Sequence, residues 1–260
     1  MNLSESSVAA ASAAWVWVPD FGAVAETGEY TILRLPDYFP HPLSVVAFRP
    51  AGALGDAVAA VLSRAREFGL PELRWLVRLG DPPGLAEELA THGGTVRLTL
   101  DVLARDLRGG SPSLPPPSVD VTVRWGTDVV TVRDSQAAAV ATFGGSVPPE
   151  ERIAEIAARD AATVPAGEGG TVVAYADGAP VGAGGLEIVD GVARLWGGGV
   201  VPSARGQGVY RALLAARLSY AVDHGATMAL VKGRIDTSGP ILLRAGFAGF
   251  GQEPIYGVPL

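Results

Sequence analysis

A proline- and glycine-rich stretch near the middle of the chain limits its fold more than any other feature. Residues 109–117 read Gly-Gly-Ser-Pro-Ser-Leu-Pro-Pro-Pro. Because proline fixes the backbone and lacks an amide donor, this stretch forms neither a helix nor a central strand. The 260 residues of the chain are enough for two domains. We therefore predict an amino-terminal domain at 1–108, a linker at 109–118 and a carboxy-terminal domain at 119–260.

The composition narrows the class of protein. Hydrophobic residues make up 48% of the chain and charged residues 18%, which is ample for buried cores, and no apolar run approaches the roughly 20 residues of a membrane helix. Residues 1–14 lack the basic start of a secretory signal, so we expect a loose tail and no membrane association. The chain has no cysteine, which excludes disulfides and thiolate ligands and makes a cytoplasmic location the default expectation.

Charge and histidine spacing argue against two kinds of partner. The net charge is −7, and Lys232 is the single lysine. Without a basic cluster we expect no nucleic-acid partner, while the acidic balance favours a cationic or amine substrate. The three histidines show no ligand spacing, so the sequence predicts no metal site.

After the linker, the hydrophobic periodicity alternates between strand and helix. Strands are predicted at 119–125, 171–176, 181–189, 192–201 and 228–231, with one or two more in 247–258. Helices are predicted at 128–142, 147–162, 208–223 and 238–245. Asp-Gly pairs at 177–178 and 190–191 are typical of hairpin turns and join three strands in an antiparallel meander. This order predicts an α/β (α+β) fold with a mixed, mostly antiparallel sheet flanked by helices.

The order of predicted elements in the first half of the chain is similar to that in the second half. A helical stretch ending at Gly69, a strand-like segment at 74–77 and a second helix ending at Gly93 match the order of elements that includes Gly225 and Gly246. The offsets between the paired glycines are 156 and 153 residues (225−69 and 246−93). The similarity fits an internal structural repeat, and it also fits a chance match. A true repeat implies that the first copy has lost its ligand site, since no glycine-rich loop precedes its helix.

The segment with the clearest chemistry follows the predicted strand at 192–201. Three consecutive glycines, Gly197–Gly199, weaken that strand and predict a bulge or a close approach of a ligand to the main chain. Pro202 ends the strand, and Arg205-Gly206-Gln207-Gly208 makes a tight turn into a long helix. The first amides of a helix lack internal acceptors and, together with the helix dipole, bind anions such as a diphosphate. Arg205 adds a charged donor.

A glycine pair alone is weak evidence in a chain with 34 glycines, so other phosphate-binding loops must be compared with it. A Walker A loop needs a lysine directly after its last glycine, and the single lysine, Lys232, lies elsewhere. A dinucleotide fingerprint needs Gly or Ala where Arg211 stands, in a parallel unit rather than after a meander. Both alternatives fit the turn worse than a simple diphosphate site does.

Taken together, these residues resemble motif A of the GNAT N-acetyltransferase superfamily, whose pattern is Gln/Arg-x-x-Gly-x-Gly/Ala. Arg205 and Gly208 match it, and Tyr210 stands where the last Gly or Ala is usual. A later helix of the family commonly ends in Gly-Phe, matched here by Gly246-Phe247. The resemblance covers residues 119–260 in the right order of elements. It implies the acyl-CoA N-acyltransferase fold, with tandem GNAT-like domains if the amino-terminal half is a degenerate copy.

This resemblance implies that acetyl-CoA, an acyl-CoA co-substrate, is the acyl donor. The diphosphate would lie on the main-chain amides of one run of residues: Arg205, Gly206, Gln207, Gly208, Val209 and Tyr210. The backbone of Val200 and Val201 would pair with the pantetheine arm. An amide near Val200 would also polarise the thioester carbonyl, which is the role of an oxyanion hole.

The catalytic groups are less well defined. Many family members carry a tyrosine on the last helix as the acid for the leaving thiolate, but the matching position here is Leu242. Tyr210 and Tyr256 are the candidate acids nearest in sequence, with a packing role as the alternative for each. Glu187, on the strand before the glycine run, is the candidate general base, with a solvated glutamate as the alternative. The lack of a plausible covalent nucleophile agrees with direct transfer.

The leading interpretation is therefore an enzyme, an acyltransferase that moves an acetyl group directly to an amine of a small molecule or a peptide. The alternative is a catalytically weak acyl-CoA-binding sensor or regulatory module. A third interpretation makes the amino-terminal half a scaffold that shapes the acceptor cleft or mimics a dimer partner. The expected state is a monomer or a homodimer. Acceptor sites in this fold correspond to about residues 128–170, where no motif identifies the acceptor.

Overall fold

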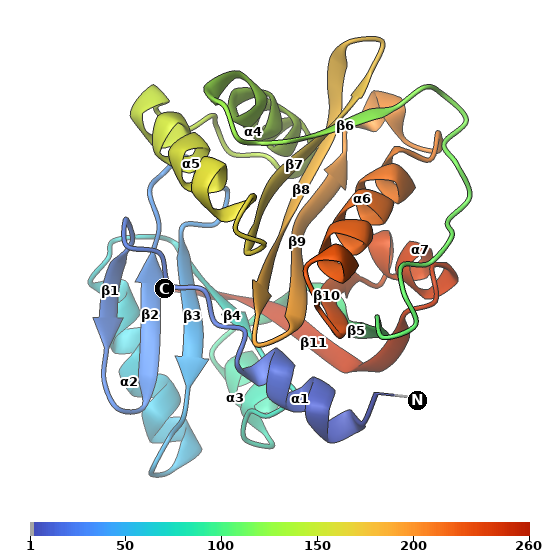
Figure 1. Cartoon of the computed structure of the whole chain (residues 1–260). Helices are drawn as coiled ribbons and strands as arrows, with labels where there is room; N and C mark the ends of the chain where they lie inside the picture. The colour runs from blue at the N-terminus through green and yellow to red at the C-terminus, as the bar shows by residue number, and fades with distance from the viewer. Residues whose placement is uncertain (1–2) are drawn as a thin grey trace. The chain divides into compact units, whose positions relative to one another are not determined.

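The computed structural model describes residues 3–260, which divide into two compact units (Figure 1). The amino-terminal unit contains Ser4–Val102, Gly233–Ile241 and Gly249–Leu260. The carboxy-terminal unit consists mainly of Leu103–Lys232 and Leu242–Ala248. The chain therefore passes from one unit to the other several times.

In the carboxy-terminal unit, neighbouring strands follow the order β5-β10-β9-β8-β7-β6. Their bounds are Thr95–Asp106 (β5), Thr122–Trp125 (β6), Gly169–Ala176 (β7), Ala179–Val189 (β8), Val192–Val200 (β9) and Met228–Arg234 (β10). Strands β6 to β9 pair antiparallel, whereas β9 and β10 are parallel. All four residues of the turns Asp177-Gly178 and Asp190-Gly191 have positive φ, as type I′ hairpin turns require. The predicted fold class and the predicted meander are confirmed.

Helices cover both faces of this sheet. They are α4 (Val129–Phe143), α5 (Glu150–Thr163), α6 (Val209–Asp223) and α7 (Ser238–Arg244). Successive residues of a strand point to opposite faces. A Cβ at Gly199 of β9 would meet α4, whereas one at Gly198 would meet α6. The end of β9 therefore lies between these two helices.

The main core of this unit lies between α6 and the sheet. Leu214 and Leu218 of α6 pack against Leu186 of β8 and Leu195 of β9, and all four are at most 2% exposed. Leu242 of α7 belongs to the same core and is fully buried. Burial of such side chains contributes about 2–3 kcal/mol each relative to exposure.

In the amino-terminal unit, the strand order is β1-β2-β3-β4-β11-β5. The remaining strands are β1 (Ala23–Glu26), β2 (Tyr30–Arg34), β3 (Leu43–Phe48), β4 (Glu72–Leu76) and β11 (Ala248–Pro259). Its helices are α1 (Glu5–Ala13), α2 (Leu54–Arg66) and α3 (Leu85–Thr91). Trp75 of β4 and Leu62 of α2 are at most 1% exposed and belong to its core.

Both halves of the chain repeat one arrangement, which confirms the internal structural repeat. Each half contains two parallel strands joined by a helix, β3-α2-β4 and β9-α6-β10. The glycines that the sequence paired, Gly69 with Gly225 and Gly93 with Gly246, all have φ between +67° and +84°. They lie just after the helices of their repeats, where a left-handed residue ends a helix.

The two repeats exchange their last strands, so the compact units do not follow the predicted ranges 1–108 and 119–260. Strand β11, from the end of the chain, pairs antiparallel with β4 of the first repeat. Strand β5, which ends the first repeat, lies next to β10 of the second. Backbone hydrogen bonds of β11 therefore join residues 249–260 to the amino-terminal unit, and the linker at 109–118 lies inside the carboxy-terminal unit.

The segment that the sequence predicted as a loose tail contains helix α1. Ser4 begins this helix, and its side chain accepts the Ser7 amide at 3.1 Å. Ser12 at its end lies 3.4 Å from the buried Glu253 carboxylate of β11. The prediction was wrong because α1 has almost no apolar periodicity, and tertiary contacts decide its place.

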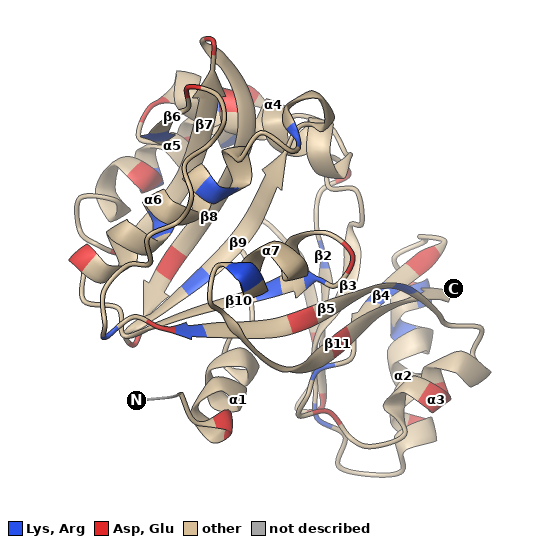
Figure 2. Ribbon diagram, turned by 90° about the vertical axis from the view of Figure 1, so that its right-hand side faces the viewer, with Lys and Arg blue, Asp and Glu red and all other residues tan. Residues whose placement is uncertain are grey.

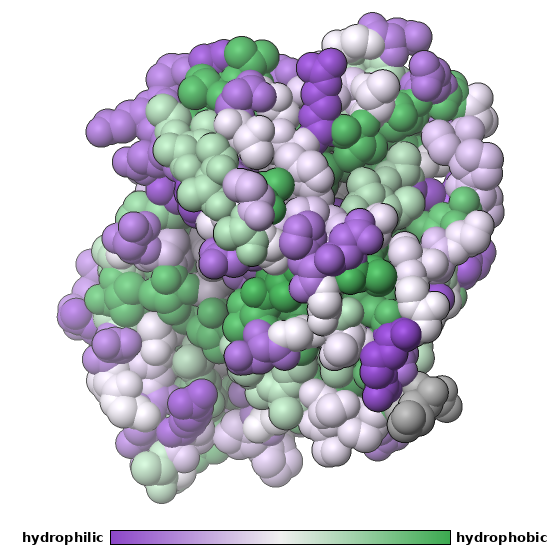
Figure 3. Space-filling view, viewed as in Figure 1, coloured by the Kyte–Doolittle hydropathy of each residue, from purple (hydrophilic) through white to green (hydrophobic). Residues whose placement is uncertain are grey.

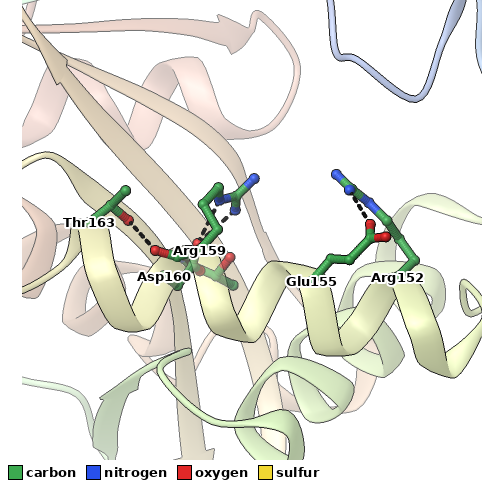
Figure 4. Close-up of polar contacts among 6 residues, drawn as sticks. Arg152, Glu155, Arg159, Asp160 and Thr163 are labelled. Carbon is green, nitrogen blue, oxygen red and sulfur yellow. Dashed lines mark hydrogen bonds and ion pairs between the residues drawn. The ribbon is translucent and has the colours of Figure 1, made fainter.

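Asp160 anchors α5 to β7. Its side chain is fully buried, Oδ2 accepts the Thr171 amide at 2.7 Å, and Oδ1 accepts two N–H groups of Arg159 (Figure 4). A buried polar group that loses its partner bears the full cost of desolvation. Asp160 is therefore expected to be essential for holding α5 against the sheet.

Replacing Asp160 tests this anchor. We expect Asp160→Ala to lower the free energy of unfolding by about 2–3 kcal/mol, because the Thr171 amide loses its acceptor. The control is Glu155→Ala on the same helix, where an exposed carboxylate pairs with Arg152 (Figure 4), and its effect should stay within about 0.5 kcal/mol. Denaturant titrations measure both, and equal losses would contradict the anchoring role.

Candidate functional site

The edge of β9 that faces β10 is paired over only part of its length. Val192–Leu195 pairs in parallel with Met228–Val231. From Trp196 to Val200, β9 continues without a strand partner on this side among residues 3–260. We call Trp196–Val200 the open edge. Its main chain can accept a ligand that lies alongside it as an added strand does.

The glycines of the open edge form the predicted bulge. The pairing of β9 with β8 shifts register there, so that β9 carries one extra residue, and Gly197 has a φ of +57°. Gly198 and Gly199 are glycines for another reason, because a side chain at either position has no room. A Cβ at Gly198 would lie 3.1 Å from Arg217 Nη2, and one at Gly199 would lie 2.6 Å from Thr142 Cγ2. The three glycines are thus required for different physical reasons.

The turn before α6 presents a row of main-chain amides. Gly206 and Gly208 have φ values of +78° and +87°. In the part of the chain that the structure describes, the amides from Gly206 to Tyr210 have no hydrogen-bond acceptor. A Cβ at Gly206 would meet nothing within 4 Å, so the turn is open there. Unpaired amides at the positive end of a helix dipole form an anion-binding site.

The proline-rich linker closes the other flank of this turn. The Ser118 amide donates to the Gln207 carbonyl at 2.9 Å, and Arg211 donates to two linker carbonyls at 3.1 and 3.2 Å. A Cβ at Gly208 would lie 2.7 Å from Pro117 Cα. The linker therefore contacts the Gln207 carbonyl and the backbone at Gly208. The row of amides stays unpaired.

Two of the predicted main-chain contacts are already partly used within the protein. Arg205 Nε donates to the Val200 carbonyl at 3.2 Å, which ties the end of the open edge to the turn. The Val201 amide donates to the Val181 carbonyl at 2.9 Å, and the Val201 carbonyl accepts the Ala204 amide at 3.0 Å. The amide of Val201 is therefore not free for a pantetheine arm in this structure.

The acetyltransferase (GNAT) family model matches residues 136–236, a range that contains the open edge, the amide turn and all of α6. Residues 136–236 are a GNAT domain. The resemblance seen in motif A is thereby confirmed.

Solved structures show the same fold over the whole chain. A GCN5-related N-acetyltransferase from Kribbella flavida is 20% identical, with 100% of this chain and 97% of that chain covered and a TM-score of 0.70. One from Sphaerobacter thermophilus is 16% identical, with 89% and 80% covered and a TM-score of 0.66. A tandem GNAT protein from the clavulanic acid biosynthesis pathway is 18% identical, with 97% and 87% covered and a TM-score of 0.58. No curated protein matches the sequence. These likenesses establish a tandem GNAT fold.

Within the GNAT domain, Tyr210 lies beside the open edge. Its ring is half-buried, and its Cε2 atom would be 3.2 Å from a Cβ at Gly198. Burial raises the pKa of Tyr210, and the positive charge of Arg217 opposes this rise. The side chain is thus a neutral phenol at physiological pH, as a proton donor must be.

Glu187 lies on β8, opposite the part of β9 that still pairs with β10. Its carboxylate is 41% exposed and lies 3.4 Å from Arg194 Nη1, with the two residues directly opposite each other on β8 and β9. Arg194, the residue of β9 opposite Glu187, comes just before the open edge.

The other two candidate positions lie in hydrophobic surroundings. Tyr256 of β11 packs against the core of the amino-terminal unit and pairs with Trp75. Leu242, which stands at the family's tyrosine position, is fully buried in the core of the carboxy-terminal unit. The GNAT domain therefore offers Tyr210 as the phenol next to its open edge.

Arg217 is a residue that the sequence analysis missed. It lies on α6 under the bulge of β9 and is 1% exposed. The available signal was its position, because residues 210, 214, 217 and 221 share the apolar face of the helix. A charged residue on such a face predicts a specific buried role.

A separate cavity of 330 Å³ lies on the same unit, near the first turn of α4. Its polar lining includes Arg124, Asp128, Asp134 and Tyr175. The Tyr175 hydroxyl donates to Asp134 at 2.8 Å, and burial, reinforced by this carboxylate, raises the pKa of Tyr175 to about 12. These groups already have partners within the protein, so the cavity carries no assigned role.

Charged residues of both signs are spread along the elements (Figure 2). Figure 2 shows acidic and basic residues interspersed along the elements, and Figure 3 shows hydrophobic areas between hydrophilic ones on the face it displays. None of the helices in residues 3–260 has the length and apolar character needed to cross a lipid bilayer. Over the same residues, no three His, Asp or Glu side chains gather as a metal site.

Proposed function

We propose that the GNAT domain binds acetyl-CoA and transfers the acetyl group directly to an amine of a small molecule or a peptide. One observation carries this proposal: five successive amides, Gly206 to Tyr210, lack acceptors within residues 3–260 at the start of α6, a few residues after the open edge. An anion site and an unpaired strand edge in succession suit a ligand with a diphosphate at one end and an amide-containing arm at the other.

The amide turn would hold the diphosphate. Gly206 is the open position of the turn, and the positive φ values at Gly206 and Gly208 would allow successive N–H groups to face one anion. Arg205 lies next to this face and keeps further N–H groups for a phosphate oxygen. The linker contacts at Gln207 and Arg211 would pre-organise the turn, which reduces the entropy lost on binding.

The open edge would hold the pantetheine arm and the thioester. Among residues 3–260 it has no strand partner on the β10 side, although the Val200 carbonyl accepts Arg205 Nε. The bulge at Gly197–Gly198 turns backbone groups away from regular pairing. An N–H group of the bulge that faces the thioester carbonyl would stabilise the negative charge on that oxygen during attack. Because glycine has no side chain, the thioester can approach the backbone closely.

Direct transfer needs a base for the amine and an acid for the sulfur. Glu187 is the candidate base, acting directly or through water. Tyr210 is the candidate acid, because it is the phenol beside the open edge. The amine acceptor would enter near α4, α5 and the loop between them.

Two phenylalanine variants identify the acid. We expect Tyr210→Phe to lower kcat about 10- to 100-fold, with CoA affinity changed by no more than about twofold, because the proposed diphosphate contacts are main-chain amides. Tyr256→Phe is the matched control and should leave kcat unchanged. The measurement is acetyl transfer to a panel of small amines and peptides, combined with CoA titration. A loss of kcat in Tyr256→Phe alone would make Tyr256 the acid. Unchanged kcat in both variants would mean that the thiolate leaves without an acid.

The same experiment separates the enzyme from an acyl-CoA-binding sensor. Turnover of acetyl-CoA with at least one amine supports the proposal. Tight CoA binding without turnover over the whole panel would contradict it and favour the sensor. Absence of CoA binding would contradict both.

A further inference from the structure

Arg217 is a buried cation without a countercharge. Its side chain is 1% exposed, Nε donates to the Leu213 carbonyl at 3.1 Å, and Nη1 donates to the Gly185 carbonyl at 3.4 Å. Nη2 has no hydrogen-bond partner, and no carboxylate in residues 3–260 forms an ion pair with the guanidinium. Burial lowers the pKa of Arg217, but a guanidinium starts from so high a value that it keeps its proton.

Such a group is unfavourable for stability. Removing a charge from water is costly, and hydrogen bonds to two carbonyls offset only part of this cost. A hydrophobic side chain of similar length would fill the same space without this cost of desolvation. A residue that breaks the rules of core packing in this way is expected at a functional position.

The surroundings of Arg217 place it under the bulge. A Cβ at Gly184 of β8 would lie 3.1 Å from Nη1, and one at Gly198 of β9 would lie 3.1 Å from Nη2. Both strands therefore carry glycine where the guanidinium approaches them. The bonded carbonyl of Gly185 belongs to the same irregular stretch of β8.

Tyr210 is the other side chain in this space. It lies seven residues before Arg217, two turns along the same face of α6. The guanidinium carbon is 6.0 Å from the centre of the phenol ring, and a Cβ at Gly198 would touch both side chains. The charge of Arg217 therefore acts on the Tyr210 ring and on the bulge at once.

We propose that Arg217 is a positioning residue for acyl transfer, which holds Tyr210 beside the open edge and stabilises its phenolate after proton donation. This inference rests on the proposed function. Replacing Gly184 or Gly198 with a larger residue would displace the guanidinium, which explains glycine at both positions.

The proposed transfer moves one proton to sulfur and takes one from the amine nitrogen. The neutral amine attacks the thioester carbonyl carbon, and the C–S bond breaks with its electron pair going to sulfur. The sulfur takes the proton from Tyr210 Oη, which leaves a phenolate next to Arg217. The new amide nitrogen then releases one proton to Glu187, directly or through water, and Glu187 returns a proton through water to the phenolate. The products are an amide and free CoA thiol, with Tyr210 and Arg217 unchanged.

Stability and activity should respond in opposite ways to loss of the charge. We expect Arg217→Met to unfold at the same or a higher denaturant concentration than the wild type, because a side chain of similar length replaces a buried charge. Its kcat should fall about 10- to 100-fold, with KM for acetyl-CoA changed by no more than about twofold. Arg217→Lys keeps the charge and should recover part of kcat. A clear loss of stability in Arg217→Met with kcat unchanged would make Arg217 merely structural and overturn the inference.

A double-mutant cycle tests whether Arg217 acts through Tyr210. If it does, Arg217→Met in a Tyr210→Phe background should lower kcat by no more than about a further twofold. Losses that multiply in the double variant would show that Arg217 acts independently of Tyr210 and would overturn the inference.

A spectroscopic readout does not depend on turnover. The ¹³Cζ resonance of labelled Tyr210, assigned by its loss in Tyr210→Phe, should titrate at a higher pH in Arg217→Met than in the wild type, because the phenolate loses its countercharge. Arg217→Lys should lie closer to the wild type. Identical titrations would overturn the inference. A wild-type protein that acetylates no amine would contradict the proposed function alone, since this titration still reports the pairing.

Discussion

Gly206→Glu should weaken CoA binding about 100-fold. The new carboxylate would enter the open side of the amide turn, where a Cβ meets nothing within 4 Å. At about 5 Å from a phosphate and an effective dielectric constant of about 20, the repulsion is roughly 3 kcal/mol, which corresponds to about 100-fold in affinity. Isothermal titration with CoA measures the change, and acetyl-pantetheine, which lacks the diphosphate, should react equally with variant and wild type.

The chain offers a matched control for this variant at the other end of the same helix. Gly225 also has a φ of +78° and has nothing within 4 Å of its ideal Cβ. Gly225→Glu therefore introduces the same charge with the same backbone strain, and it should leave CoA affinity within about twofold. Equal losses in both variants would show that strain or net charge causes the effect. Unchanged affinity in Gly206→Glu would remove the diphosphate assignment.

Gly169→Ala should be among the most destabilising single substitutions in the carboxy-terminal unit. Gly169 begins β7 with a φ of +100°, and a Cβ there would lie 2.3 Å from the Leu186 carbonyl oxygen. This atom belongs to the backbone of β8, so it cannot rotate away as a side chain does. Strain in φ and displacement of β8 together should lower the free energy of unfolding by more than about 3 kcal/mol.

Gly178, in the turn at the other end of β7, is the control. Its φ is +76°, but a Cβ there would meet nothing within 4 Å. Gly178→Ala should therefore cost only the left-handed strain of about 1 kcal/mol. Urea titrations compare the two variants. If both lose the same free energy, the close approach of Gly169 to β8 contributes nothing, and the packing argument is wrong.

Much of the carboxy-terminal half could be predicted because its signals are local. The Asp-Gly turns adopt positive φ at both residues, as their type demands, and the Asp128 carboxylate caps α4 by accepting the Thr131 amide. The three glycines of β9 form the expected bulge. Each of these features depends on a few neighbouring residues, so a sequence pattern suffices to identify it.

The exchange of final strands could not be predicted in this way. A strand shows its alternation of side chains in the sequence but not the identity of its partner, because the main chain of any strand can pair with any other. Strand β11 pairs with β4, more than a hundred residues away in the chain. The linker was identified correctly as a non-helical segment, but its contact with the amide turn requires the fold.

By itself, the sequence determined the order of elements after the linker and the turn at Gly206 and Gly208 that presents main-chain amides, because these follow from periodicity and from the conformational freedom of glycine. Only the tertiary structure decided which strands pair, which amides stay unpaired and which side chains meet under the bulge. Arg217 shows the reason: its charge is visible in the sequence, but its burial without a countercharge arises only when α6 packs against β8 and β9.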